Sequence, residues 1–259
     1  MRSGDFIFVS KPADKNRLDK LIFDRGLAPS RERAQALVIA GKVLVNGQKI
    51  EKPGTSVDSS AKLQLLGEDL KYVSRGGLKL ERALEYWKID VQGRKCADIG
   101  TSTGGFTDCL LQHGAARVIA IDTGLGQIAY QLRQDSRVRL LEKTNARYLT
   151  REQLGEVTDF IAVDVSFISA TLVLPPVILA AFPEDRTGCE LVVLVKPQFE
   201  VGRERVGKGG IVRDAEAQHE AVEKVRVAVR RLDPASIDVI DSPILGAEGN
   251  REFLLYAKF

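Results

Sequence analysis

The stretch that decides the fold is Cys96-Ala97-Asp98-Ile99-Gly100-Thr101-Ser102-Thr103-Gly104-Gly105-Phe106, in which an apolar strand runs into a glycine-rich turn. A helical segment, 107–112, follows directly. Glycines permit a tight turn and let a ligand approach the backbone where a Cβ would collide. The stretch is neither the G-x-G-x-x-G dinucleotide pattern nor a P-loop. A simple strand-to-helix connection has the same local pattern, so the neighbouring turns must decide whether a ligand binds here.

Strands and helices alternate regularly through the rest of this region. The strands that we expect are 96–99, 118–122, 138–142, 160–165, 191–196, 237–242 and 253–259. Continuous apolar runs such as 192–195 indicate strands buried on both faces, hence a parallel sheet covered by helices. The last two strands need no helix between them, so the final strand is free to run antiparallel. The pattern predicts an α/β fold with a doubly wound, Rossmann-like sheet.

The ends of the next two strands carry side chains suited to adenosine. Asp122 ends the second strand, and its carboxylate can accept both hydroxyls of a ribose. Asn145 follows the third strand in Thr144-Asn145-Ala146-Arg147 and could meet an adenine edge. Ligands of such sheets bind beyond the carboxyl ends of the strands. Together with the glycine turn, these residues predict a bound adenosine.

Charged residues at the ends of the later strands suggest proton transfer. Lys196 emerges from a buried strand, which is costly unless a carboxylate such as Asp164 pairs with it. A lysine can take a proton from a hydroxyl if desolvation and a second cation lower its pKa, and Lys79 could be that cation. Glu252, at the start of the last strand, could complete the group. Taken alone, Lys79 and Glu252 are more typical of solvated charges.

The first 71 residues carry 13 Lys and Arg against 9 Asp and Glu, whereas the remainder is balanced at 25 to 26. Two helices are expected here, one from residue 17 to Gly26 and one capped by Ser30 that ends at Gly41. A hairpin with Asn46-Gly47 at its turn and a strand over 62–66 follow. Positive side chains gather on the helices, which alone would favour a merely solvated face, but the order of helix, glycine, strand and Asn-Gly turn favours a phosphate-binding surface. These are Lys20, Arg25, Arg31 and Arg33.

Several of these motifs resemble known families. The segment from Arg17 to Gly47 resembles the S4-type RNA-binding domain, and the three turns resemble the class I S-adenosylmethionine methyltransferases. Lys79, Asp164, Lys196 and Glu252 resemble the Lys-Asp-Lys-Glu tetrad of FtsJ-like ribose 2′-O-methyltransferases. Over essentially the whole chain the sequence resembles the TlyA family, named for hemolysins and known as cytidine 2′-O-methyltransferases of ribosomal RNA. The fourth strand also lacks the Asn/Asp-Pro-Pro-Tyr/Phe turn of many base N-methyltransferases.

The resemblance implies S-adenosylmethionine as cofactor and a role for each matched residue. Lys196 would accept the proton, Asp164 and Lys79 would orient it and set its pKa, and Glu252 would complete the network. Asp98 would lie beneath the turn, where it either shapes the loop or contacts the cofactor. The other implied cofactor-binding residues are Gly100, Thr101, Ser102, Gly104, Gly105 and Phe106 beside the methionine part, Asp122 at the ribose, Asn145 at the base, and Asp164.

The same resemblance implies three parts of the chain. An S4-type domain is expected over 1–66, with 1–15 as a flexible arm, then a linker over 67–77 and a methyltransferase domain over 78–259. Ribosomal RNA or ribosomal subunits would be the partners. Further RNA contacts are expected from Lys42, Arg75 and a glycine-flanked loop that contains Arg203, Arg205 and Lys208.

Other classes of protein fit the sequence less well. Three separated cysteines indicate reduced thiols and a cytoplasmic protein, and the two histidines lack metal-ligand spacing, so no metal is expected. The longest apolar stretch, 172–182, contains Pro175 and Pro176, and no membrane partner is expected. A catalytically inactive assembly factor and, less consistent with the sequence, a membrane-lytic hemolysin are the alternative functions. Monomer and weak dimer are both compatible with the sequence.

Overall fold

The computed structural model describes residues 15–28, 30–66, 71–246 and 248–259, and the chain divides into two compact units, 1–69 and 70–259. Most of the arm predicted over 1–15 lies outside the described residues. Lys15 does not belong to an arm, because it already pairs with Asp58 in a small sheet. Among the described residues, no helix is long and apolar enough to cross a membrane.

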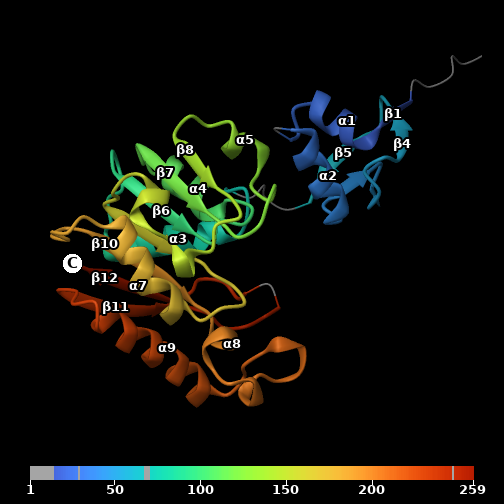
Figure 1. Ribbon diagram of the computed structural model, residues 1–259. Coiled ribbons are helices and arrows are strands. Elements are labelled where there is room, and N and C mark those ends of the chain that lie inside the picture. The colour runs from blue at the N-terminus through green and yellow to red at the C-terminus, as the bar shows by residue number, and fades with distance from the viewer. Residues whose placement is uncertain (1–14, 29, 67–70, 247) are drawn as a thin grey trace, which may run out of the picture. The chain divides into compact units, whose positions relative to one another are not determined.

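The first unit consists of two helices and two small antiparallel sheets (Figure 1). Its elements are β1 (Lys15–Arg17), α1 (Leu18–Asp24), α2 (Arg31–Ile39), β2 (Val43–Val45), β3 (Gln48–Lys49), β4 (Ser56–Asp58) and β5 (Leu63–Leu65). β2 lies between β3 and β5, and β1 pairs with β4. Leu18, Ile22 and Val38 of the helices form its core together with Val43 and Val57 of the strands.

The local signals in this unit are confirmed. The Ser30 hydroxyl accepts the Arg33 amide at 3.1 Å and begins α2. Asn46 and Gly47 both have positive φ, +51° and +82°, as a type I′ hairpin turn requires. The β1–β4 pair was not predicted, because strands of three residues show too little alternation to be recognised.

The second unit contains a seven-stranded sheet in the order β11-β12-β10-β9-β6-β7-β8. Its strands are β6 (Lys95–Ile99), β7 (Arg117–Ile121), β8 (Val138–Leu141), β9 (Phe160–Val163), β10 (Glu190–Val195), β11 (Ser236–Asp241) and β12 (Phe253–Lys258). The helices are α3 (Gly76–Trp87), α4 (Gly105–Gln112), α5 (Tyr130–Arg133), η1 (Ala146–Tyr148), α6 (Arg151–Leu154), α7 (Ala170–Ala181), α8 (Pro197–Glu200), η2 (Arg203–Arg205), η3 (Lys208–Gly210) and α9 (Ala215–Arg230).

The strand order places the ends of β6, β9 and β10 side by side. Together with β7 and β8 these strands form a run of five parallel strands in the order β10-β9-β6-β7-β8. β12 runs antiparallel to β10 and β11, and the predicted doubly wound sheet is confirmed. The chain leaves β6 toward β7 on one side and returns later to β9 on the other. Ligands bind at such a switch point, outside the carboxyl ends of the strands.

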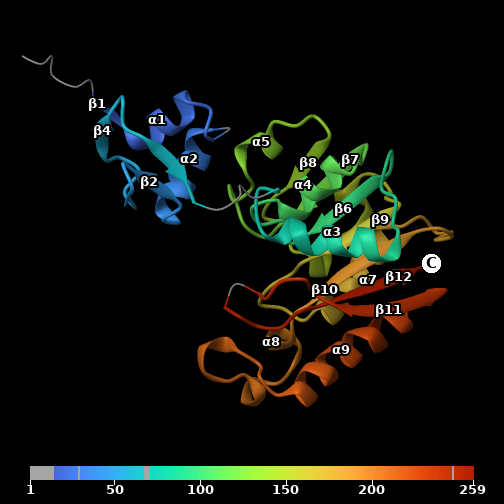
Figure 2. The same cartoon turned by 180° about the vertical axis from the view of Figure 1, so that it is seen from behind.

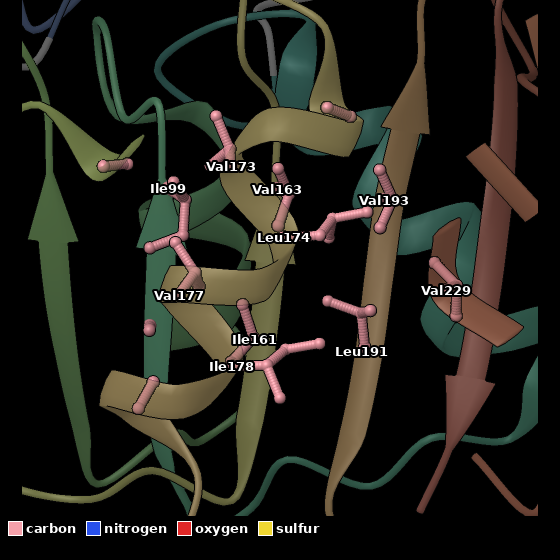
Figure 3. Packing of buried hydrophobic residues seen from close by; sticks show 14 of the residues in the cluster. Ile99, Ile161, Val163, Val173, Leu174, Val177, Ile178, Leu191, Val193 and Val229 are labelled. Carbon is pink, nitrogen blue, oxygen red and sulfur yellow. The ribbon is translucent and has the colours of Figure 1, made fainter. Parts of the chain in front are cut away.

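Helices cover both faces of the sheet, as the two views of Figures 1 and 2 show. On one face, α3 and α4 pack on side chains such as Phe160 and Val192. On the other face, α7 and α9 pack on Ile161 and its neighbours. Figure 3 shows Leu174 of α7 between the side chains of β9 and β10. Successive strand residues thus enter opposite cores, which explains the continuous apolar runs.

The segment before α3 differs from the linker expected over 67–77. Tyr72 is only 2% exposed and belongs to the core under α3 and α4. The Val73 amide donates to Asp108 at 2.7 Å, and α3 begins at Gly76. From residue 71 onward this segment therefore packs on the second unit, because an aromatic anchor among polar residues shows no periodicity that would reveal its burial.

Helix α7 provides a matched test of the core. We expect Leu174→Ala to lower the free energy of unfolding of the second unit by about 2–5 kcal/mol, because the fully buried side chain leaves a cavity. Leu179→Ala on the same helix removes a side chain that is 62% exposed and should change it by less than about 0.5 kcal/mol. Urea unfolding measures both, and equal losses would contradict the packing described here.

Candidate active site

The glycine turn after β6 is fixed between two neighbouring strand ends. Gly100 has φ +88°, and a Cβ there would collide with the carbonyl oxygen of Asp164. Its amide donates to the carbonyl of Ile121 at 2.8 Å, and the Asp164 amide donates to Ile99 at 2.8 Å. Only glycine lets the backbone after β6 come this close to the backbone after β9.

Two hollows of about 280 and 220 Å³ flank this turn and share Gly100, Ser102 and Asp164. The first extends past Asp122 and Asn145 toward Val173 of α7. The described residues of its lining include two carboxylates but no lysine or arginine, together with an apolar wall. This combination fits a nucleoside with a positive charge, because one carboxylate can hold ribose hydroxyls while the other faces the cation.

Asp122 and Asn145 line the first hollow while also shaping the backbone. The two carboxylate oxygens of Asp122 accept the amides of Ser102 and Gly124, both at 2.7 Å. Each oxygen keeps a lone pair for a ligand hydroxyl. The Asn145 side chain accepts the Arg147 amide at 3.0 Å and begins η1, so its amide nitrogen is the group left to meet a base.

Asp98 lies beneath the turn and is fully buried. Its Oδ2 accepts the amide and the hydroxyl of Thr107 at 3.0 and 2.6 Å, which ties β6 to α4. Its Oδ1 is buried without a hydrogen-bond partner among the described residues. Burial, reinforced by the nearby carboxylates of Asp164 and Asp122, raises the pKa of Asp98 to about 7.

The expected pairing of Lys196 with Asp164 is confirmed. The Lys196 Nζ lies 2.6 Å from the Asp164 Oδ1, and both side chains are largely buried. Lys196 directly follows β10, and Asp164 follows β9, which is the neighbouring parallel strand. The same ammonium donates to the Ser166 hydroxyl at 2.8 Å.

Lys79 and Glu252 form a second, more deeply buried pair. The Lys79 Nζ lies 2.5 Å from Glu252, and their side chains are 10% and 3% exposed. Judged alone, each of these residues would be expected at a solvated position. The fold instead buries both. Lys79 also lines the second hollow together with Asp164. Lys196 lines neither hollow itself, but it contacts Asp164 and Ser166, which line the first.

The other predicted cofactor residues fall into two groups. Thr101, Gly105 and Phe106 line the second hollow beside Gly100 and Ser102. Gly104 and Asp98 line neither hollow. A Cβ on Gly104 would meet Leu132 and Ile128, so this glycine allows the turn to pack on the core rather than forming the surface of a hollow.

The predicted RNA-binding residues also divide. Lys20, Arg75, Arg203 and Lys208 are exposed, Arg33 and Lys42 are partly buried, and Arg31 lies 3.4 Å from the buried Asp19. Arg25 donates to the carbonyls of Ser59 and Ala61 at 2.5 and 2.7 Å, and Arg205 pairs with Asp214 and Glu220 of the α9 region. Arg25 and Arg205 thus join parts of their own units, so their charges are poor candidates for phosphate contacts.

Sequence reasoning missed several residues that line the site. Ser166 contacts Lys196 and lines the first hollow. Phe167, which is 91% exposed, lines the same hollow. Ser74 lines the second hollow. The available signal was position, because Ser166 and Phe167 directly follow the strand expected over 160–165 and lie close to Asp164 in the sequence.

The raised pKa of Asp98 has a measurable consequence. Between about pH 4 and pH 7 the carboxyl ionises in the unfolded chain but stays protonated in the folded one, so the wild-type protein loses stability as pH rises. We expect Asp98→Asn, which cannot ionise, to gain on the order of 4 kcal/mol relative to wild type across this range. Urea unfolding at pH 4 and pH 8 measures the difference. A constant difference would show that Asp98 ionises normally in the folded protein.

The chain matches two family models: the FtsJ-like methyltransferase over residues 72–259 and the S4 domain over residues 16–63. It is 44% identical to the 16S/23S rRNA (cytidine-2′-O)-methyltransferase TlyA of Mycobacterium tuberculosis, over 95% of this chain and 91% of that one. It is 39% identical to Hemolysin A of Brachyspira hyodysenteriae, over 93% and 98%.

A solved structure from Streptococcus thermophilus, described as that of a candidate hemolysin, is 43% identical and superposes with a TM-score of 0.69, over 95% of this chain and 89% of that one. The likeness thus spans both units in sequence and in structure. With two paired lysines and carboxylates beside the glycine turn, the chain belongs to the FtsJ-like methyltransferases that carry an S4 domain, the TlyA family.

Proposed function

We propose that this protein transfers a methyl group from S-adenosylmethionine to a ribose 2′-hydroxyl of structured RNA, a cytidine of ribosomal RNA. The observation that carries the proposal is the Lys196–Asp164 contact of 2.6 Å beside a hollow suited to a cationic nucleoside. The TlyA relative, which is 44% identical, is named for this reaction on 16S and 23S rRNA.

The residues of the first hollow fit the cofactor. Asp122 would hold the ribose hydroxyls, Asn145 would meet the base, and the apolar side chains of Ile168 and Val173 would cover its ring. Gly100 and Ser102, which line this hollow, would border the methionine part. When bound, S-adenosylmethionine supplies an electrophilic methyl group on a positively charged sulfur.

The protein's own side chains remove the proton of the ribose 2′-hydroxyl. A ribose hydroxyl is a poor nucleophile, so a base must take its proton as the oxygen attacks. Lys196 accepts this proton, and Asp164 holds its Nζ and balances the ammonium that results. Lys79 is kept in place by Glu252 and lines the second hollow together with Asp164. Its positive charge sets the electrostatic environment of the Lys196–Asp164 pair.

RNA is held by both units. Lys20 and Lys42 of the first unit can contact phosphates, which gives affinity and position without base specificity. Arg75, at the start of α3, is exposed and lines the second hollow, so it can hold a phosphate beside the reacting ribose. This division of labour suits RNA that is recognised by its shape.

Mapping 2′-O-methyl groups tests the function directly. Ribosomal RNA from cells with the protein, without it and with Lys196→Ala should show one or a few cytidines that are methylated only with the intact protein. Methyl groups on bases instead of riboses would contradict the proposed acceptor. Cofactor binding without any RNA methylation would point to an inactive assembly factor.

Lys196→Ala separates chemistry from cofactor binding. We expect kcat to fall by roughly 10²- to 10⁴-fold because the proton acceptor is lost, while the Kd for S-adenosylmethionine changes less than about twofold. Single-turnover methylation and calorimetry measure the two quantities. Lys258→Ala is the matched control, since Lys258 is exposed and pairs in register with Glu190 at the far end of β10. Normal turnover in Lys196→Ala would refute the assigned base.

Salt dependence tests the first unit. The double substitution Lys20→Ala/Lys42→Ala should weaken RNA binding and reduce the slope of log K against log salt by about 0.7–0.9 for each phosphate that the variant no longer neutralises. Lys52→Ala removes an exposed cation of the same unit outside the predicted set and should leave the slope unchanged. An unaltered slope in the double variant would exclude a role for these two lysines in phosphate binding.

A further inference from the structure

Two side-chain oxygens, one of Asp164 and one of Ser166, contact the amine of Lys196. Its Nζ lies 2.6 Å from the Asp164 Oδ1 and donates to the Ser166 Oγ at 2.8 Å. Asp164 and Ser166 are two residues apart on the segment that leaves β9, and both line the first hollow. Ser166 itself is exposed, so its hydroxyl sits at the mouth of this hollow rather than in the core.

The segment that carries Ser166 is fixed at both ends. At its start, the Asp164 amide donates to Ile99 at 2.8 Å. At its end, the buried Glu200 accepts the Ser169 hydroxyl and the Ala170 amide at 2.5 and 2.7 Å. A hydroxyl held between two anchored points can direct another group, whereas one on a free loop would follow it.

We propose that Ser166 is a positioning residue that fixes the direction in which Lys196 accepts the proton of the substrate hydroxyl. This inference rests on the proposed function. A neutral lysine amine has two hydrogens and one lone pair, arranged tetrahedrally. The hydrogen bond to Ser166 takes one hydrogen, and the negative charge of Asp164, whose Oδ1 lies 2.6 Å away, attracts the other, so the lone pair takes the remaining direction.

Asp164 alone does not determine that direction. The contact with Asp164 is an ion pair in which the Asp164 Oδ1 accepts no hydrogen bond from the described residues, so it leaves the amine free to rotate about the Cε–Nζ bond and the lone pair would sweep a cone. The hydrogen bond to Ser166 stops this rotation before the substrate arrives. Preorganisation of this kind acts on the rate of the chemical step, because misdirected catalytic groups slow reaction without changing how substrates bind.

The test compares Ser166→Ala with Ser166→Thr, which keeps the hydroxyl acceptor at an exposed position with room for a methyl group. In Ser166→Ala we expect kcat to fall about tenfold, the worth of one oriented hydrogen bond, with KM for RNA and for cofactor within about twofold. Ser166→Thr should restore most of kcat. Ser236→Ala, an exposed serine at the start of β11, is the matched control and should behave as wild type.

A second readout does not depend on activity. ¹⁵N relaxation of the Lys196 Nζ, assigned by its loss in Lys196→Ala, should report faster rotation about the Cε–Nζ bond in Ser166→Ala than in wild type or Ser166→Thr. If no form of the protein methylates RNA, the proposed function fails and this relaxation still decides the role of Ser166.

Three results would overturn the inference. Unchanged relaxation in Ser166→Ala would show that Asp164 alone orders the amine. An unchanged kcat would show that the orientation does not matter. A raised KM for RNA with normal kcat, or a loss that Ser166→Thr shares, would make Ser166 a substrate contact instead.

Discussion

The structure depends on a constraint on buried charge: an amine can leave water only where a carboxylate meets it. Lys196 and Lys79 are both largely buried, and each lies within 2.6 Å of a carboxylate. Neither partner is near in sequence, so the sheet must bring them together. The loss of one partner would leave the other charge buried and uncompensated, which is far more costly than losing an exposed pair.

The parallel register of β6, β9 and β10 provides this meeting point. Ile99 pairs with Val163, and Val163 pairs with Val193, so the three chains emerge at the same edge. Gly100 then comes close to the backbone of Asp164, which joins the glycine turn to the segment after β9. The glycine turn and the Lys196–Asp164 pair are consequently positioned by the same few backbone contacts, and a shift in one strand would displace both.

Electrostatics distinguish the residues that can act on a ligand from those that maintain the fold. Asp98 is committed to Thr107 and is held in an environment that raises its pKa to about 7, whereas Asp122 keeps lone pairs that face the hollow. Among the cations, Arg25 donates to a backbone carbonyl and Arg205 pairs with a carboxylate of its own unit, while Arg75 remains exposed at the second hollow. The two aspartates are the same residue type, and so are the three arginines. Only their surroundings differ.

The sequence alone determined the strands of the seven-stranded sheet, the burial of its central strands on two faces, the Asn46-Gly47 hairpin and the glycine turn, because these follow from periodicity and from neighbours along the chain. It also supplied the residue types that the chemistry needs. Tertiary structure decided which charges meet, that Lys79 and Glu252 are buried, that Ser166 holds Lys196, and that the chain from residue 71 packs on the second unit. Burial and pairing depend on strand order and register, which join residues more than 150 positions apart and leave no local signal.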